Sequence, residues 1–282
     1  MAQAKKPVVK TKKKVVPVKK VVVQPKKTEV VEVKKVEVVA KQPERVKVKS
    51  EVTVDLKELL EAGAHFGHQS RRWNPKMKPY IFTTRDGVHI FDLTLTAQKI
   101  KEAADAIADW VSQGQEIIFV GTKRQAQPII REEALKVGAP YVATRWLGGM
   151  LTNWTEMERR IKRLNDLKAK REKGELKLYT KRERVMIDKD IAKLERFFGG
   201  IAHLTERPQA LFVVDTHKEV AAVKEAKKLN LMVIGLVDTN ADPYEVTIPI
   251  PINDDAVRSI KLVVNKMAEA YRQGRQIKDQ GK

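Results

Sequence analysis

The sequence predicts an α/β protein with a mainly parallel sheet, helices on both of its faces and one helical insertion. Short apolar segments alternate along the chain with segments of helical periodicity, which is the pattern of successive β-α units. The strand segments are almost wholly apolar, as is typical of parallel strands that are buried on both faces. A charged segment without proline, residues 154–198, interrupts the alternation and predicts an antiparallel pair of helices.

The first elements lie between residues 54 and 114. Residues 54–68 predict a helix with Asp55 near its start and Gly63 near its end. Two β-rich runs then flank residues 85–87, whose Asp-Gly pair is typical of a hairpin turn. Residues 94–114 predict a long helix that is closed by Gly114. Its apolar residues stand at helical spacing: Leu95, Ile100, Ala104, Ile107 and Val111.

The rest of the α/β domain continues on both sides of the insertion. Strands are predicted at residues 115–122, 139–146, 209–216, 231–239 and 246–252. Helices are predicted at residues 123–138, 217–230 and 253–274. The strand at 246–252 should lie at a sheet edge, because Pro249 and Pro251 cannot donate ladder hydrogen bonds. The final helix should be capped by Asn253 or Asp254.

The insertion at 154–198 is predicted to be a protruding coiled-coil hairpin whose two arms join near residues 174–180. The arms carry narrow apolar stripes that would bury each other: Ile161, Leu164 and Leu167 on one arm, and Ile187, Ile191, Leu194 and Phe198 on the other. Residues 155–197 also carry 15 Lys/Arg and 9 Asp/Glu. This charge is either the solvated face of an exposed coiled coil or, in part, an RNA contact.

Residues 1–50 form a low-complexity, Lys/Val/Pro-rich segment that we predict to be a disordered basic tail. Residues 51–153 and 199–282 would make up the α/β domain. The formal net charge of the chain is +20, and the 16 Lys/Arg and 4 Glu of residues 1–50 account for +12 of it. The tail is either a generic polyanion-binding segment or a solvated segment without a specific role.

Composition narrows the class of partner. A charge of +20 favours a polyanion, with nucleic acid ahead of an anionic membrane surface. The absence of cysteine excludes disulfides, thiolate metal ligands and cysteine nucleophiles. No apolar run approaches the roughly 20 residues of a membrane span, and the N-terminal segment lacks the apolar core of a signal peptide. We therefore expect a cytosolic protein.

An enzyme is the rival hypothesis, and it depends on Asp215 and Asp238, which follow predicted strands. Ligands of open α/β sheets bind at such strand ends. No dinucleotide-binding or P-loop motif occurs, and Lys123 in the segment "VGTKR" is only a weak phosphate-binding signal. His65 and His68 would form a divalent metal site only if the fold brought Asp215, Asp238 or Asp242 close to them. We expect no cofactor, with a structural divalent ion at His65, His68, Asp215 and Asp238 as the alternative.

Residues 65–82 combine basic and aromatic side chains and are the strongest candidate for RNA contact. Basic groups pair with phosphates and planar groups stack on bases, although the aromatic residues could instead anchor the loop on the core. Residues 144–154 repeat the combination around Gly148 and Gly149. The predicted RNA contacts are Arg71, Arg72, Trp73, Lys76, Lys78, Lys123, Arg124, Arg145, Trp146 and Asn153.

Five segments in these regions resemble, in the family's order, the signature segments of the bacterial-type small-subunit ribosomal protein two family. They are "LLEAGAHFGHQSRRWNPKMKPYIF", "FVGTKRQAQ", "RWLGGMLTN", "ALFVVDTHKE" and "GLVDTNADP". The resemblance covers roughly residues 54–270. It implies a flavodoxin-like or Rossmann-like domain with a protruding hairpin, and no catalysis. It also implies binding to small-subunit rRNA near the head–body junction and to neighbouring ribosomal proteins, including the multi-domain small-subunit protein one. The tail is not a general feature of the family.

The leading hypothesis is therefore a structural, rRNA-binding constituent of the small ribosomal subunit that supports subunit assembly and translation. We expect no membrane partner and no small-molecule substrate. An α/β enzyme that binds a metal or nucleotide through Asp215 and Asp238 is the first alternative. A membrane- or nucleoid-associated scaffold, for which the tail alone would suffice, is the second.

Overall fold

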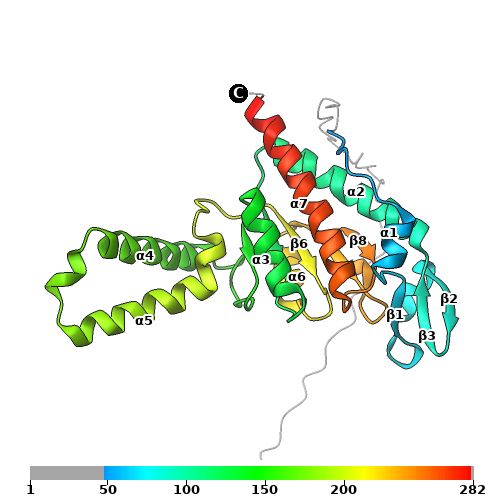
Figure 1. The fold of residues 1–282 in the computed structure, drawn as a ribbon, viewed down its shortest axis with the longest axis horizontal. Helices are drawn as coiled ribbons and strands as arrows, with labels where there is room; N and C mark the ends of the chain where they lie inside the picture. Colours follow the sequence, from blue (N-terminus) through cyan, green and yellow to red (C-terminus); the bar gives the residue numbers. More distant parts are fainter. Residues whose placement is uncertain (1–47, 281–282) are drawn as a thin grey trace, which may run out of the picture. The chain divides into compact units, whose positions relative to one another are not determined.

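The computed structural model describes residues 48–280. The prediction of a disordered tail at residues 1–50 therefore falls almost wholly outside the described residues. A five-stranded sheet forms the centre of the described part, in the order β5-β4-β6-β7-β8 (Figure 1). Its strands are β4 (Ile117–Val120), β5 (Tyr141–Val142), β6 (Ala210–Val214), β7 (Met232–Val237) and β8 (Ile248–Pro251).

All four strand pairings in this sheet are parallel. The chain enters the sheet in its interior at β4, moves to the edge strand β5 and then returns past β4 to β6. This is the flavodoxin-like order of doubly wound sheets, with its switch point between β4 and β6. The predicted parallel α/β sheet and the proline-containing edge strand β8 are thereby confirmed.

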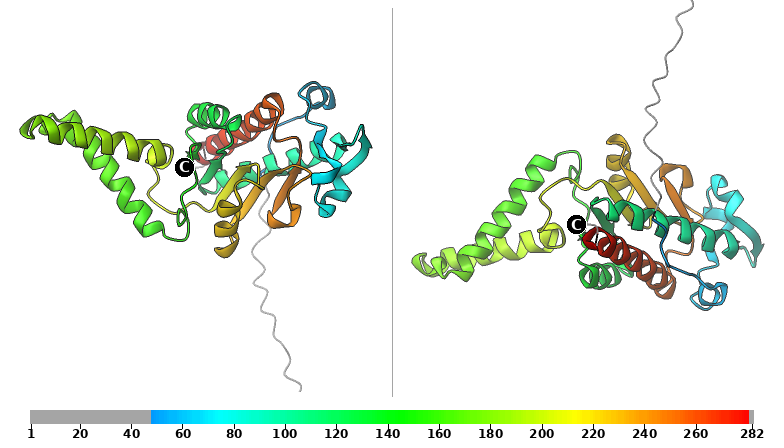
Figure 2. Two further views of the ribbon diagram at one scale, coloured as in Figure 1. Left: turned by 90° about the horizontal axis from the view of Figure 1, so that it is seen from below. Right: turned by 90° about the horizontal axis from the view of Figure 1, so that it is seen from above.

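Helices cover both faces of the sheet, and Figure 2 shows the two layers from opposite sides. On one face lie α2 (Leu93–Ser112), α3 (Ala126–Val137) and α7 (Val257–Gln280), which share a core with alternate strand residues such as Phe119 and Phe212. The intervening residues, such as Ile118 and Leu211, point to the other face and pack with α6 (Val220–Lys228). The strands are apolar at every position because both faces are buried.

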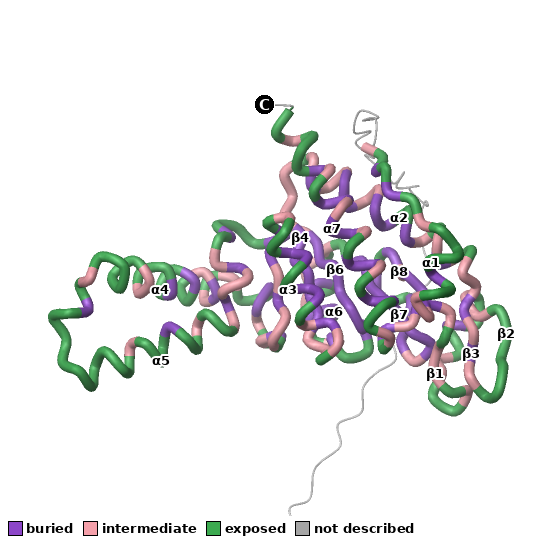
Figure 3. Tube along the Cα trace, viewed as in Figure 1, coloured by how far each residue is buried: buried purple, intermediate pink, exposed green. Residues whose placement is uncertain are grey.

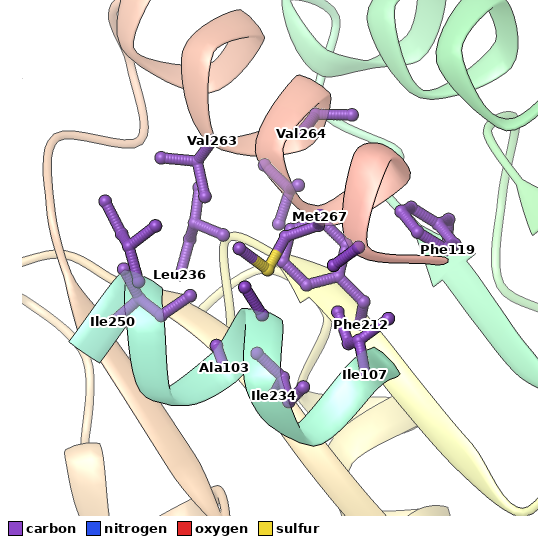
Figure 4. Close-up of a cluster of buried hydrophobic side chains, with 14 of the residues drawn as sticks. Ala103, Ile107, Phe119, Phe212, Ile234, Leu236, Ile250, Val263, Val264 and Met267 are labelled. Atoms are coloured by element: carbon purple, nitrogen blue, oxygen red, sulfur yellow. The ribbon is translucent and has the colours of Figure 1, made fainter. Parts of the chain in front are cut away.

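The core beneath α2 and α7 is drawn in Figure 4. Met267 and Val264 of α7 and Ile107 of α2 lie over Phe212 and Ile234 of the sheet. All five residues are completely buried. Burial of apolar surface on this scale, at about 25 cal/mol per Å², is the main favourable contribution to folding.

A second, antiparallel sheet has the order β1-β3-β2. It consists of β1 (Phe66–Gln69), β2 (Ile81–Arg85) and β3 (Val88–Phe91), and the short helix α1 (Leu56–Glu61) precedes it. Asp86 and Gly87 join β2 to β3 with φ of 51° and 76°, as a two-residue hairpin turn requires, so the predicted hairpin is confirmed. The helix predicted at 54–68 is shorter than expected, because it ends before Gly63 and residues 66–69 form β1 instead.

The insertion consists of two antiparallel helices, α4 (Trp154–Glu172) and α5 (Lys181–Phe198). The first runs away from the sheet and the second runs back toward it (Figure 1). A left-handed Gly174 and the 3₁₀ turn η3 (Glu175–Leu178) connect them. Thr180 and Glu183 form a reciprocal capping box at the start of α5. Figure 3 shows that most of the hairpin is exposed, with the buried positions along its inner side. The helical hairpin is present, whereas coiled-coil packing of its arms stays a prediction.

Four further 3₁₀ turns complete the described chain: η1 (Ser70–Arg72), η2 (Pro75–Tyr80), η4 (Gly199–Ile201) and η5 (Pro243–Glu245). Neither Asn253 nor Asp254 stands directly before α7, which begins at Val257. The side-chain oxygen of Asn253 instead accepts from the backbone N–H groups of Asp255 and Ala256, in the turn that precedes the helix. None of the helices within residues 48–280 combines the length and apolar character that crossing a membrane requires.

Candidate nucleic-acid interface

The segment Ser70–Tyr80 forms a rigid, basic loop between β1 and β2. Met77 is completely buried beneath it, and the backbone N–H of Asn74 donates to the carbonyl of Thr239 at 2.6 Å. The Asn74 side chain also accepts from the N–H of Lys76 and so caps η2. The loop is therefore fixed to the end of β7, and its basic side chains are presented from an ordered backbone.

The loop carries four exposed cations, Arg71, Arg72, Lys76 and Lys78. Arg71, Arg72 and Lys78 form no ion pair with another of residues 48–280. Lys76 differs from them, because its ammonium is paired with Asp242 and lies 6.0 Å from the centre of the Tyr244 ring. The hydrogen bond to Asp242 raises the pKa of Lys76. Lys76 is thus already neutralised by a neighbour, while the other three cations are available to phosphates.

The sequence left two roles open for Trp73, which are stacking on a base and anchoring the loop on the core. Its ring packs on His89 of β3, with centroids 4.9 Å apart and planes inclined by 46°, and it remains half-buried. One face of the indole therefore anchors the loop. Burial also lowers the pKa of His89, which keeps this packing partner neutral at pH 7.

The carboxyl ends of β4 and β6, where a flavodoxin-like fold places its ligand, are filled by an internal ion cluster. The Lys123 ammonium lies 3.2 Å from Asp215, 2.7 Å from Asp254 and 2.6 Å from Asp255. Its side chain is only 14% exposed. Burial disfavours the charge, but the attraction of the three aspartates outweighs it and holds the pKa of Lys123 above its ordinary value. Lys123 therefore makes an internal contact where the sequence predicted an RNA contact.

Asp254 connects this cluster to a second pair at the end of β7. Its backbone N–H donates to Asp238, and Asp238 lies 3.0 Å from the Nδ1 atom of His68. Burial and the charges of Asp238 and Asp215 raise the pKa of Asp254 to about 7, against the opposing effect of Lys123. The nearby carboxylate of Asp238 in turn raises the pKa of His68. The sequence analysis did not predict Asp254 and Asp255 as members of this cluster, although their position directly after the last strand is a signal for the sheet's ligand-binding edge.

The four metal-ligand candidates do not converge on one point. His68 and Asp238 lie together, but the His65 ring instead packs against Phe66 with centroids 4.0 Å apart. Asp215 contacts the Lys123 ammonium. Across residues 48–280, no three His, Asp or Glu side chains are grouped as a metal site. These residues do not fit a divalent ion, because a lysine already supplies the positive charge among the carboxylates.

The second basic–aromatic segment, residues 144–154, is organised by Glu225 of α6. The Glu225 carboxylate accepts from the Trp146 indole N–H at 3.2 Å and from the backbone N–H groups of Gly149, Leu151 and Thr152. These backbone donors outweigh burial and hold the pKa of Glu225 below its ordinary value. Trp146 is only 7% exposed, so its ring faces the core and is not free to stack on a base.

The remaining predicted contacts lie on the surface. Arg145 and Arg124 are exposed, and so is Asn153 at the start of α4. Arg145 and Arg124 form no ion pair within the described part of the chain. Glu225 was missed by the sequence analysis, since a single Glu on a helix with Lys neighbours carries no signal that it binds a loop more than 70 residues earlier.

The fold and the site together define a class. This is a flavodoxin-like α/β protein in which ion pairs close the ligand-binding edge of the sheet. Its surface loops carry exposed cations, such as Arg71 and Arg145, that form no ion pair with another described residue. Residues 59–274 match the family described as Ribosomal protein S2. The chain belongs to this family, as the resemblance of its signature segments indicated, and it is a ribosomal protein of the small subunit with a role in translation.

Proposed function

We propose that the chain is a structural, non-enzymatic constituent of the small ribosomal subunit that binds small-subunit rRNA through the Ser70–Tyr80 loop. The observation that carries this proposal is the exposure of Arg71, Arg72 and Lys78 without ion pairs in the described chain. Free cations on a preordered backbone bind phosphates without first breaking internal ion pairs or ordering the loop.

Arg145, Arg124 and Asn153 would extend this interface at the other loops, and Trp73 would offer its exposed face to a base. Other small-subunit proteins, including the multi-domain protein one, are the proposed protein partners. The proposed location is the small subunit in the cytoplasm. The rival catalytic use of Asp215 and Asp238 has little support, because Lys123 occupies the crevice that a nucleotide or metal would need.

The test replaces Arg71, Arg72 and Lys78 together by Ala and measures affinity for protein-free small-subunit rRNA over a range of salt concentrations. Each lost phosphate contact should reduce the slope of log K against log salt by about 0.7–0.9, so we expect a reduction of about two. Replacement of Arg258, Lys261 and Arg272 by Ala is the matched control, since these are three exposed cations on α7.

Only the loop variant should lose affinity beyond the effect of its reduced charge. Both variants should unfold at the wild-type urea concentration, since all six side chains are exposed. Equal loss in the two variants would overturn the assignment of the loop as the RNA site.

A further inference from the structure

A groove with a volume of about 380 Å³ lies between α2 and the amino ends of β7 and β8. Its floor is apolar and includes Trp110, Met232 and Ile248, of which Met232 is 40% exposed. Met232 and Ile248 are the first residues of their strands, whereas the Ser70–Tyr80 loop is fixed to the carboxyl end of β7. The groove is therefore at the end of the sheet opposite to the proposed RNA-binding loop.

One wall of the groove shows how α2 holds an extended backbone. Asp109 accepts from the N–H of Val48 at 3.2 Å, and Asp105 accepts from the N–H of Ser50 at 2.7 Å. Four residues of a helix rise by about 6.0 Å and two residues of an extended chain by about 6.6 Å, so successive turns of α2 meet every second residue of this segment. Figure 1 shows the segment, in blue, beside α2.

An acidic rim surrounds the apolar floor. Glu102, Asp105 and Asp109 line the groove, and Lys49 is the only cation among its described lining residues, so the local formal charge is −2. This charge opposes that of the chain beyond residue 50, which carries +8 of the net +20. Within the described chain only one carboxylate oxygen of Asp105 is hydrogen-bonded, and the Glu102 side chain is 53% exposed. Each carboxylate offers about four acceptor positions, so the rim can accept further cationic donors.

We propose that this groove binds an extended, basic segment of a neighbouring protein. Successive side chains of an extended segment point to opposite sides, so apolar residues can face the floor while the long stems of lysine or arginine reach the rim. A phosphate backbone does not fit, because the three carboxylates would repel it. The inference rests on the proposed function for its partner, since proteins that assemble on the same rRNA are themselves basic.

The test measures binding of a peptide of alternating lysine and valine to the full chain, by the shift of the Trp110 indole N–H resonance. The groove variant is Glu102→Gln with Asp109→Asn, whose amide oxygen can still accept from Val48. The control is Glu172→Gln with Glu175→Gln, the same charge change at two exposed carboxylates in the helical insertion. We expect the groove variant to bind the peptide about tenfold more weakly and the control to bind like the wild type.

A second variant tests the floor of the groove instead of its rim. Met232→Lys places a charge of the same sign as the peptide at a side chain that is already 40% exposed. We expect weaker peptide binding with the urea midpoint of the wild type. Unchanged peptide binding in this variant would contradict the proposed occupant.

Two further results would overturn the inference. One is equal peptide affinity of the groove and control variants. The other is the absence of a Trp110 shift with the wild type, which is expected if a basic segment of the chain itself already fills the groove.

Measurements with rRNA separate this inference from the proposed function. The groove variant should keep the wild-type affinity for protein-free small-subunit rRNA, and weaker rRNA binding would overturn the groove as a separate protein site. The variant that lacks Arg71, Arg72 and Lys78 should bind the peptide as the wild type does, whatever its affinity for rRNA. Weaker peptide binding by that variant would likewise overturn the groove.

Discussion

At the scale of single residues, the charge balance at the carboxyl ends of β4 and β6 depends on one ammonium group. Lys123 is the cation that lies against Asp215, Asp254 and Asp255, and the first two of these are buried. A buried ion pair contributes little when intact, but removal of one partner leaves an uncompensated charge in a poorly solvated place. The same group closes the crevice at the β4–β6 switch point.

Replacement of Lys123 by Met should therefore destabilise the protein strongly. We expect a loss of about 3–5 kcal/mol in the free energy of unfolding, measured by urea titration at pH 8. The loss should be smaller at pH 6. The pKa of Asp254 is already raised to about 7, so the folded state takes up a proton there that the unfolded state does not bind, and protonation removes the uncompensated charge.

Lys76→Met is the matched control for this change, because it breaks an exposed ion pair with Asp242. Its urea midpoint should stay close to that of the wild type at both pH values. A Lys123 variant as stable as the Lys76 variant would contradict the role given to the cluster.

The contacts of single residues were also the feature that the sequence predicted least well. Lys123 and Trp146 were expected to contact RNA, but the structure surrounds one with aspartates and buries the other against Glu225. The partners lie 131 and 79 residues away along the chain. Whether a basic or aromatic side chain finds an internal partner depends on tertiary contacts, which local composition does not contain. For Arg71 and Arg72 the pattern predicted exposed cations, and they are exposed.

At the scale of elements, the close approach of α2 and α7 holds one face of the sheet together. Gly274 of α7 permits it, since a Cβ atom there would lie 2.6 Å from the carbonyl oxygen of Ala108 and 2.9 Å from the Cβ of Val111. These neighbours are parts of a packed helix and cannot move independently. The glycine is needed for space rather than for backbone freedom.

Gly274→Ala should destabilise the protein, although Ala is intrinsically the better helix former by about 1 kcal/mol. Overpacking against the α2 backbone costs about 1–3 kcal/mol, so we expect a net loss of about 1 kcal/mol in a urea titration. Arg272→Ala, at an exposed position of the same helix, should cause no loss. A Gly274→Ala variant more stable than the wild type would show that the two helices do not pack this closely.

The elements themselves were largely predictable. Apolar runs of strand length and helical periodicity located β4, β6, β7 and the helices around them, because burial on both faces leaves a strong signal in each strand. The sequence missed β1, whose residues Phe66–Gln69 include a glycine and two polar side chains, and overestimated α1 accordingly. Its pairing with β3 is register-shifted, and such a strand is specified by its partner rather than by its own residues.

At the scale of the whole molecule, the net charge and the fold carry different information about the partner. Residues 1–50 carry +12 of the net +20, and a segment of this kind suits any polyanion. The specific part is the α/β body, with its closed strand ends, its free loop cations and its family membership over residues 59–274. Salt dependence alone therefore does not distinguish a ribosomal protein from another polyanion-binding protein.

Co-sedimentation of the native, full-length protein with small ribosomal subunits through a moderate-salt gradient is the most direct test of the central claim. We predict that the protein travels with the small subunit in near-stoichiometric amount and that variants of Arg71, Arg72 and Lys78 shift toward the top of the gradient. A wild-type protein that stays at the top of the gradient, apart from the subunits, would contradict the account.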